Sequence, residues 1–272
     1  MLGWVFRKRG TMNATVQISQ PRPGVALVTI ARPERMNAID PATDRAMGEA
    51  LAALEREAVV RCIVITGAGD KAFCTGADIP ELLPHMKANI AADRDDPQFC
   101  GATHRNATSK PLLAAINGLA LGGGLELALA CDLRIAADHA RFGLPEIRLG
   151  VLAGGGGCTR LPRTVPAALA AEMILTGEPI TAQRALEAGL VSRVVERARL
   201  LDEALALAHT VAQRAPLALR ACTALLRRPR FEELDEALRA ERALFAQVLG
   251  SEDADEGIQA FAQKRPPAWR GR

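Results

Sequence analysis

The sequence predicts an α/β fold that ends in a helical C-terminal region. Short apolar segments typical of strands alternate with helices and glycine-rich loops up to about Pro166. Beyond that point helices follow one another, and Val191–Val195 is the last segment typical of a strand. A chain of 272 residues with 49% hydrophobic side chains is also long enough to bury a large core. We therefore expect a core of residues 12–195 and a helical subdomain of residues 196–272.

The N-terminal half carries the strand signals. Two strands, Val16–Ser19 and Ala26–Ala31, flank the turn Pro21–Gly24. Asp40 followed by Pro41 is typical of a helix start, which predicts a helix over Pro41–Glu57. Three further segments are nearly continuous apolar runs, as expected of strands buried on both faces: Cys62–Thr66, Leu112–Ile116 and Leu133–Ala136.

The C-terminal half is predicted to be helical. Thr181 is expected to cap one helix, and Gly189 follows its end. Leu201, Ala204, Leu205 and Ala208 form an apolar stripe that we interpret as core or subunit packing. The predicted helices are Ala167–Leu175, Thr181–Ala188, Leu200–Ala215, Leu217–Leu226, Phe231–Val248 and Glu252–Lys264.

One internal stretch, Pro84–Thr108, has no clear periodicity. It is polar and carries several aspartates, so we expect a loop there, near a functional site.

Composition excludes several classes of protein. The 34 basic residues nearly balance the 31 acidic ones, giving a net charge of +3, so charge provides no argument for nucleic-acid binding. No apolar run reaches the length of about 18 residues that a membrane-spanning helix needs. The basic start Met1–Thr11 lacks the apolar segment of a secretory signal, and Met12 is an alternative start. The cysteines form no C-x-x-C motif and the histidines have no metal-ligand spacing, so we expect a cytoplasmic protein without a metal site.

Two glycine-rich stretches each follow a predicted buried strand. They are Ala72–Ile79 and Asn117–Ala128, and the second contains Gly122, Gly123 and Gly124 and opens a helix. Small residues let backbone N–H groups face a cavity, and a helix start adds free donors and the positive end of the helix dipole. If the two stretches are adjacent, they can supply the paired donors of an oxyanion hole.

The glycines also allow a purely structural interpretation. Neither a dinucleotide-binding motif at Gly67–Gly69 nor a P-loop is present. Tight packing of a helix against a strand would require glycines in the same way, so both interpretations stay open.

Two glutamates, Glu126 and Glu146, lie among apolar residues. A buried carboxylate is costly unless it is paired or functional, and burial raises its pKa towards the range that is useful for acid–base catalysis. The alternative for Glu126 is an ion pair with a nearby arginine. A third glycine cluster, Gly154–Gly157, follows Glu146 closely. Residue chemistry alone therefore indicates two donor loops and two candidate acid–base groups.

The chain resembles the crotonase superfamily of enoyl-CoA hydratases and isomerases from about Thr15 to Pro267. The combination of motifs around Ala77, Glu126 and Glu146 is the most specific part of this resemblance. The matching stretches are Arg32–Ala38, Lys71–Glu81, Asn117–Asp132, Phe142–Gly150, Gly154–Leu161 and Glu256–Phe261 with Lys264–Pro266.

The resemblance implies a crotonase-like spiral of ββα repeats with a C-terminal helical trimerisation region, and a homotrimer or dimer of trimers. It implies an acyl-CoA substrate, with the N–H groups of Ala77 and Gly123 forming the oxyanion hole. Glu126 and Glu146 match the two hydratase glutamates, which hold and activate one water. That water adds to a 2-enoyl-CoA to give a 3-hydroxyacyl-CoA, and neither a metal nor a further cofactor is needed.

Further residues in the matching motifs are implied to bind substrate. Gly76, Gly122 and Gly154 line the loops, and Asp78 either does so or orients the local backbone. Arg35 and Lys71, with Lys264 and Arg265 of the basic tail, are candidates for the CoA phosphates, although a solvated charge explains each of them as well. Cys74 and Cys131 flank the implied site and are interpreted as small core residues.

Three departures from the family pattern bear on acyl preference. Ala153 stands where a proline is usual, Thr75 stands where an alanine is usual, and Gly157–Leu161 differs from the usual Gly-Thr-Gln-Arg-Leu. The two glutamates favour a hydratase, because isomerases of this fold usually keep only the one that matches Glu146. An isomerase, a related acyl-CoA dehydratase, and a catalytically silent or RNA-binding protein are the alternatives.

Overall fold

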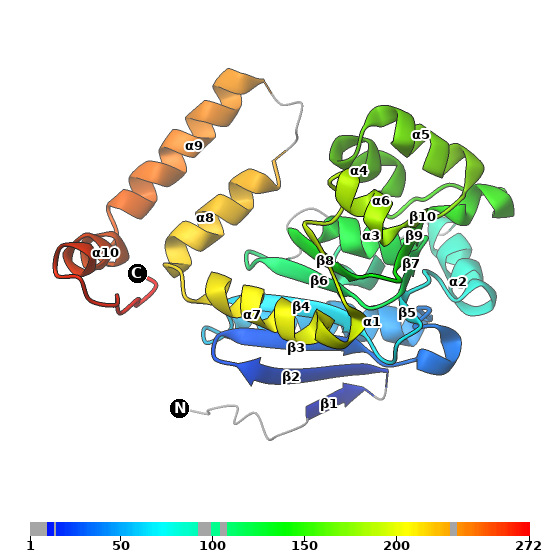
Figure 1. Ribbon diagram of the computed structural model, residues 1–272, viewed down its shortest axis with the longest axis horizontal. Coiled ribbons are helices and arrows are strands. Elements are labelled where there is room, and N and C mark those ends of the chain that lie inside the picture. The colour runs from blue at the N-terminus through cyan, green and yellow to red at the C-terminus, as the bar shows by residue number, and fades with distance from the viewer. Residues whose placement is uncertain (1–9, 14, 92–98, 104–107, 229–232) are drawn as a thin grey trace.

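The computed structural model describes residues 10–13, 15–91, 99–103, 108–228 and 233–272, and these form two sheets surrounded by helices (Figure 1). Within the described residues, the larger sheet has seven strands in the order β1-β2-β3-β4-β6-β8-β11. Its first three strands are antiparallel, and β3 to β11 run parallel. Their bounds are β1 Gly10–Asn13, β2 Val16–Arg22, β3 Val25–Ile30, β4 Cys62–Gly67, β6 Leu112–Ile116, β8 Leu133–Ala137 and β11 Arg193–Val195.

The smaller sheet has the order β10-β9-β7-β5, and three of its strands are only three residues long. Three parallel strands of the larger sheet are each followed by one strand of the smaller sheet: β4 by β5, β6 by β7, and β8 by β9. This alternation is the repeat that the resemblance implies, and it confirms the predicted fold class. The bounds are β5 Ala72–Cys74, β7 Leu119–Leu121, β9 Arg141–Gly143 and β10 Ile180–Thr181.

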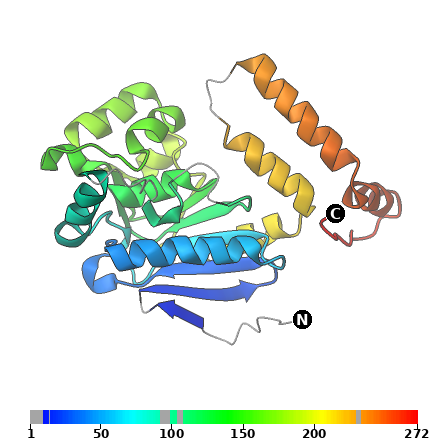
Figure 2. The same ribbon diagram turned by 180° about the vertical axis from the view of Figure 1, so that it is seen from behind.

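Two helices cover opposite faces of the larger sheet. The side chains of β4 alternate between them: Ile63 and Ile65 pack in the cluster that contains α1 (Pro41–Arg56), whereas Cys62 and Val64 pack against α7 (Leu200–Ala212). Figures 1 and 2 show these two helices on either side of the strands. Because both faces are covered, every residue of β4 and β6 is buried, as their continuous apolar sequence predicts.

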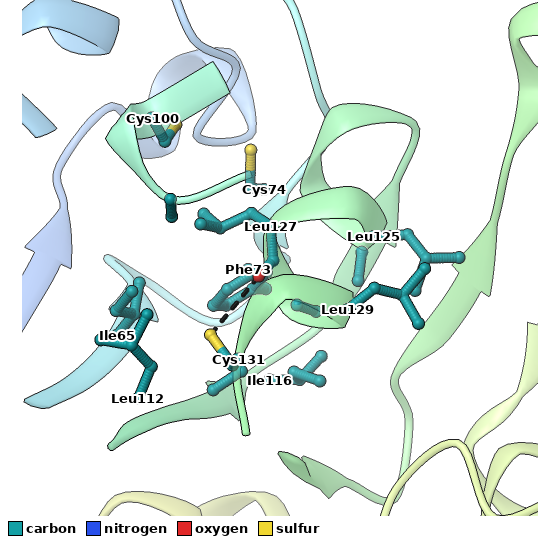
Figure 3. Packing of buried hydrophobic residues seen from close by; sticks show 14 of the residues in the cluster. Ile65, Phe73, Cys74, Cys100, Leu112, Ile116, Leu125, Leu127, Leu129 and Cys131 are labelled. Carbon is teal, nitrogen blue, oxygen red and sulfur yellow. Dashed lines mark hydrogen bonds between the residues drawn. The ribbon is translucent and has the colours of Figure 1, made fainter. Parts of the chain in front are cut away.

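The main core extends from α1 to the helix α3 (Gly123–Ala130), which packs against β5 and β7 and is buried along nearly its whole length. Figure 3 shows Leu125, Leu127 and Leu129 of α3 together with Phe73 and Ile116 in this core. An all-round apolar helix of this kind has no solvent face, so a polar side chain on it lies in the interior.

The remaining helices connect and extend the core. The predicted caps are present: Asp40 accepts the Thr43 N–H at 2.7 Å, and Thr181 accepts the Arg184 N–H at 3.1 Å. Figure 1 shows α8 to α10 extending away from the sheets, whereas α7 lies across the larger sheet. The bounds are α2 Ile79–Ala91, α4 Gly157–Thr164, α5 Ala167–Thr176, α6 Ala182–Glu187, α8 Pro216–Leu226, α9 Leu234–Leu249 and α10 Glu252–Ala262, with short 3₁₀ helices η1 Pro33–Arg35, η2 Phe99–Gly101, η3 Pro145–Leu149 and η4 Arg197–Arg199.

Two expectations from the sequence need correction. The stretch Pro84–Thr108 is not all loop, because α2 runs through Pro84 to Ala91 and η2 follows at Phe99–Gly101. The rest of that stretch, residues 92–98 and 104–107, lies outside the described residues, as does Phe231, the predicted start of α9. The stripe on α7 begins at Leu200 and not at Leu201, which is 41% exposed.

The predicted boundary between residues 195 and 196 stays a prediction, although α7 beyond it packs on the larger sheet. In the part of the chain that the structure describes, no helix is both long enough and apolar enough to cross a membrane.

Lys110, which lies just before β6, binds carbonyl groups at the C-terminal end of α1. This contact gives a test of the core. It is only 2% exposed, and its Nζ donates to the carbonyl oxygens of Leu54 at 2.5 Å and Glu57 at 2.6 Å. Lys110→Met keeps the stem but removes the charged donor, so the Leu54 and Glu57 carbonyls keep only the backbone N–H groups of Glu57 and Val60. We expect the free energy of unfolding in urea to fall by about 2 kcal/mol. Lys87→Met on the exposed face of α2 should leave it unchanged, and an unchanged Lys110→Met protein would contradict this role.

Candidate active site

The loop after β5 presents a backbone donor at Ala77. Ile39 forms an isolated parallel bridge with Ala77, in which Ile39 donates to the Gly76 carbonyl at 2.8 Å and accepts the Asp78 N–H at 2.7 Å. The Ala77 N–H is left out of this pairing and, as in any extended segment, points to the other side. Among the described residues it has no hydrogen-bond acceptor.

The first turn of α3 presents the second donor at Gly123. Gly122 precedes the helix with φ +55°, and its N–H donates to Gly143 of β9 at 2.9 Å. Gly123 is the first helical residue, so its N–H has no partner within the helix and lies at the positive end of the helix dipole.

The two donor segments lie against each other. A methyl group on Gly76 would come within 2.9 Å of the Gly123 nitrogen, and one on Gly124 would come within 1.9 Å of the Cys74 carbonyl oxygen. The tight packing and the paired donors, which the sequence left as alternatives, are therefore the same feature. The structure thus places the segments that carry Ala77 and Gly123 side by side, as an oxyanion hole requires, and the role of the two N–H groups stays a prediction.

Glu126 lies one turn into α3 and is 4% exposed. Its Oε1 accepts the Gly157 N–H at 2.7 Å, and a methyl group on Gly155 would lie 2.6 Å from its Oε2. Burial raises the pKa of Glu126, while the N–H groups of Gly157 and Gly155 and the Arg160 guanidinium partly offset this effect. Among the described residues, the carboxylate is therefore held by backbone donors of the glycine run Gly154–Gly157 and forms no arginine ion pair.

Glu146 approaches the same helix end from η3. Its Oε1 would lie 3.0 Å from a methyl group on Gly122, next to the Gly123 donor. Its Oε2 is buried and, among the described residues, has no hydrogen-bond partner. Burial and the charge of Glu126 raise the pKa of Glu146 from 4.5 to about 7. The two carboxyl groups are thus close enough to interact, and their surroundings differ.

Asp78 is held by a buried arginine. Arg32 places Nη2 at 3.2 Å from Asp78 Oδ2 and at 3.1 Å from Asp40 Oδ2. Asp78 directly follows Ala77, so this ion pair fixes the donor loop to the N-terminal end of α1. The structure places the Asp78 carboxylate in this ion pair, and its role in substrate binding or in orienting the backbone stays a prediction.

The turn at residues 99–103 covers Gly123. A methyl group on Gly123 would lie 2.7 Å from the Phe99 ring, so the ring rests directly on this backbone. The Cys100 N–H donates to Asp44 of α1 at 2.6 Å, and a methyl group on Gly101 would lie 2.4 Å from the Gly48 Cα. The sequence did not predict Phe99 as a site residue, because it belongs to the stretch that was expected to be a loop.

Other predicted binding residues are not gathered at these carboxylates. Arg35 and Lys71 are exposed at the surface, and Gly154 is the exposed first member of the glycine run. Gly76 and Gly122 lie beside the donors, as described above. The roles of all of them in binding CoA stay predictions.

The buried cysteines beside the site belong to the core. Cys131 donates from Sγ to the Leu127 carbonyl at 3.4 Å, as Figure 3 shows, and Cys74 packs against Gly124 of α3. Burial raises the pKa of both thiols to about 12, and Asp132 adds to the effect at Cys131. These thiols stay protonated near neutral pH and are not activated nucleophiles.

Comparison with known proteins agrees with this geometry. The sequence model of the family described as Enoyl-CoA hydratase/isomerase matches residues 20–272. The (E)-benzylidenesuccinyl-CoA hydratase of Thauera aromatica is 42% identical over 96% of this chain and 100% of its own length. The 2,3-dehydroadipyl-CoA hydratase of Escherichia coli is 43% identical over 91% of this chain and 96% of its own. A crystal structure of an enoyl-CoA hydratase from Bacillus anthracis superimposes with a TM-score of 0.87 at 34% identity, covering 95% of this chain and 100% of that one.

The chain therefore belongs to the crotonase superfamily, in the enoyl-CoA hydratase/isomerase family of enzymes. This confirms the resemblance inferred from the motifs around Ala77, Glu126 and Glu146.

The raised pKa of Glu146 predicts an unusual pH dependence of stability. The folded protein keeps a proton on Glu146 that the unfolded chain releases above pH 4.5. The stability that this proton provides is complete below pH 4.5 and is lost as the pH rises to about 7. Glu146→Gln cannot ionise, so its unfolding free energy should not suffer this loss. The difference in unfolding free energy, variant minus wild type, should therefore be about 2 kcal/mol larger at pH 8 than at pH 4. Urea unfolding at pH 4 and pH 8 measures this difference, with the exposed Glu172→Gln variant as control. The same difference between variant and wild type at both pH values would contradict the prediction.

Proposed function

We propose that this protein hydrates a 2-enoyl-CoA thioester to the 3-hydroxyacyl-CoA. The observation that supports this most strongly is the pairing of Glu126 and Glu146 beside the donors of Ala77 and Gly123. Hydration needs two proton movements and the stabilisation of one developing negative charge, and these groups can provide all three. The named relatives are hydratases and, in Salmonella arizonae, a carnitinyl-CoA dehydratase at 41% identity, which by name performs the reverse type of reaction.

The surroundings of the two glutamates suggest their roles. Glu126 accepts N–H donors, which favour its ionised form, so it acts as the base that takes a proton from water. Glu146 has the pKa of about 7 and a buried, unpartnered Oε2, so it acts as the acid. Carboxyl groups whose environments separate their pKa values in this way can serve as a base and an acid at the same pH.

The proposed reaction proceeds at the α3 helix end. As the water oxygen bonds to Cβ, its proton passes to Glu126 and the double-bond electrons move towards the thioester oxygen. The N–H groups of Ala77 and Gly123 stabilise that oxygen, and one such donor is typically worth about 3 kcal/mol in the transition state. Glu146 then donates its proton to Cα, and exchange with solvent restores both groups. Because the thioester itself acidifies Cα, the proposal includes no metal and no further cofactor.

A second group of observations concerns assembly, and we propose the homotrimer or dimer of trimers that the family resemblance implies. Several large apolar side chains on the C-terminal helices are exposed in the single chain, among them Leu226 at 79% and Phe261 at 88%. Exposed side chains of this size are typical of interaction surfaces. Sedimentation equilibrium should give a mass of about three or six times 28.9 kDa, and a monomer at micromolar concentration would contradict the proposal. The cytoplasmic location stays a prediction.

The activity can be tested with a panel of enoyl-CoA thioesters of varied chain length, including acyl groups that carry a distal carboxylate. Loss of the enoyl absorbance measures hydration. We expect Glu146→Gln to lower kcat by about 10²–10⁴-fold, because the acid that protonates Cα is missing. Glu172→Gln on the exposed face of α5 is the matched control and should behave as the wild type.

Three outcomes would overturn the proposal. Full activity of Glu146→Gln would show that Glu146 is not the acid that protonates Cα. Turnover of a 3-enoyl-CoA that survives Glu126→Gln would indicate an isomerase instead. No turnover of any thioester, together with steeply salt-dependent RNA binding, would indicate a binding protein.

A further inference from the structure

Arg160 connects two segments that both contact the proposed site. It lies in α4, the helix that begins at the last residue of the glycine run Gly154–Gly157. Its side chain is half-buried. Its Nη1 donates to the Gly155 carbonyl at 3.1 Å, and its Nη2 donates to the Thr103 carbonyl at 2.5 Å. A planar guanidinium offers two such acceptors separate nitrogens in a rigid fork, whereas a lysine donates from a single nitrogen on a flexible stem.

The first connection reaches Glu126. The glycine run contacts Arg160 at Gly155 and also at Gly156, where a methyl group would lie 2.0 Å from Nη1. The same run contacts Glu126 at Gly155 and Gly157, the latter through the 2.7 Å hydrogen bond. A change in the position of Arg160 therefore changes the donors that hold the proposed base.

The second connection reaches the oxyanion hole. Thr103 closes its turn on Phe99, whose N–H donates to the Thr103 hydroxyl at 2.9 Å. The Phe99 ring rests on Gly123, the proposed donor at the start of α3. By holding the Thr103 carbonyl, Arg160 also fixes the ring that packs on the Gly123 backbone.

The turn at residues 99–103 has a second anchor that does not involve Arg160. Asp44 accepts the Cys100 N–H, and Gly101 packs on Gly48, both on α1. Loss of the Arg160 contacts should therefore shift the turn and the glycine run relative to each other without unfolding the core.

Charge acts in the same direction as these contacts. Two charged groups from neighbouring elements act on the proposed pair: Arg160 of α4 lowers the pKa of Glu126, and Glu126 itself raises the pKa of Glu146 of η3. A cation behind the glycine run thus favours the ionised form that a base needs.

We propose that Arg160 is a positioning residue for the reaction, which holds the glycine run against Glu126 and the turn at residues 99–103 against Gly123. It touches no reacting atom in this role. The inference rests on the proposed hydratase function and goes beyond it by assigning the geometry of both halves of the site to one side chain.

Two variants separate the contacts from the charge. Arg160→Met removes both, and Arg160→Lys keeps the charge but not the two-carbonyl fork. Arg163→Met, on the exposed face of the same helix, is the matched control. For each folded variant, kcat and KM with crotonyl-CoA are measured across pH, and amide hydrogen exchange is measured in peptides that cover residues 99–103 and 154–157.

For Arg160→Met we expect kcat to fall about 10–100-fold with KM changed less than about threefold, as misplaced catalytic groups produce. The fall of kcat at low pH should move to higher pH in this variant, because Glu126 without the cation takes up a proton more readily. Arg160→Lys should restore the wild-type pH at which kcat falls, but it should not restore the maximal kcat. Exchange should become faster in both peptides of Arg160→Met and Arg160→Lys, and stay at the wild-type rate in Arg163→Met.

Other results would overturn the proposal. One is an Arg160→Met variant with wild-type kcat, pH profile and amide exchange. Another is a rise in KM alone, which would indicate that Arg160 contacts substrate. Full rescue by Arg160→Lys would show that charge acts without positioning. If the wild type hydrates no thioester, the proposed function fails, whereas the exchange measurement still decides whether Arg160 holds the two segments.

Discussion

The close approach of α3 to the loop after β5 is the constraint on which the rest of the site depends. A carbonyl oxygen of Cys74 lies where any side chain at Gly124 would have to be, so only glycine permits this contact. The approach brings the free N–H of Gly123 beside the loop that carries Ala77. It also buries α3, which takes Glu126 out of water. One packing contact therefore produces both the donor pair and the desolvated carboxylate.

The two glutamates show how environment separates chemically identical groups. Glu126 is the more buried, yet backbone donors of the glycine run and the nearby Arg160 compensate its charge. Glu146 is also desolvated, its Oε2 has no partner among the described residues, and it faces the charge of Glu126, so its pKa rises to about 7. Burial alone would raise both values, and the distribution of hydrogen-bond donors decides which group keeps its proton.

Long and strongly patterned elements could be predicted, and short ones could not. The buried strand at Cys62 and the helix capped by Asp40 follow from local sequence. The three-residue strands of the smaller sheet have too few residues to show a period, and they exist because a partner strand lies beside them. The helix through Pro84 and the exposure of Leu201 depend equally on what packs nearby.

The sequence by itself determined the class of fold, the family, and the candidate residues Ala77, Gly123, Glu126 and Glu146, because glycine runs and isolated buried acids are costly unless they serve a purpose. Only the tertiary structure decided how these residues meet. It also revealed Arg160 as the link between the glycine run and the turn at residues 99–103. The physical reason is that hydrogen bonds between segments far apart in the chain leave no periodicity in the sequence, whereas local propensity and burial do.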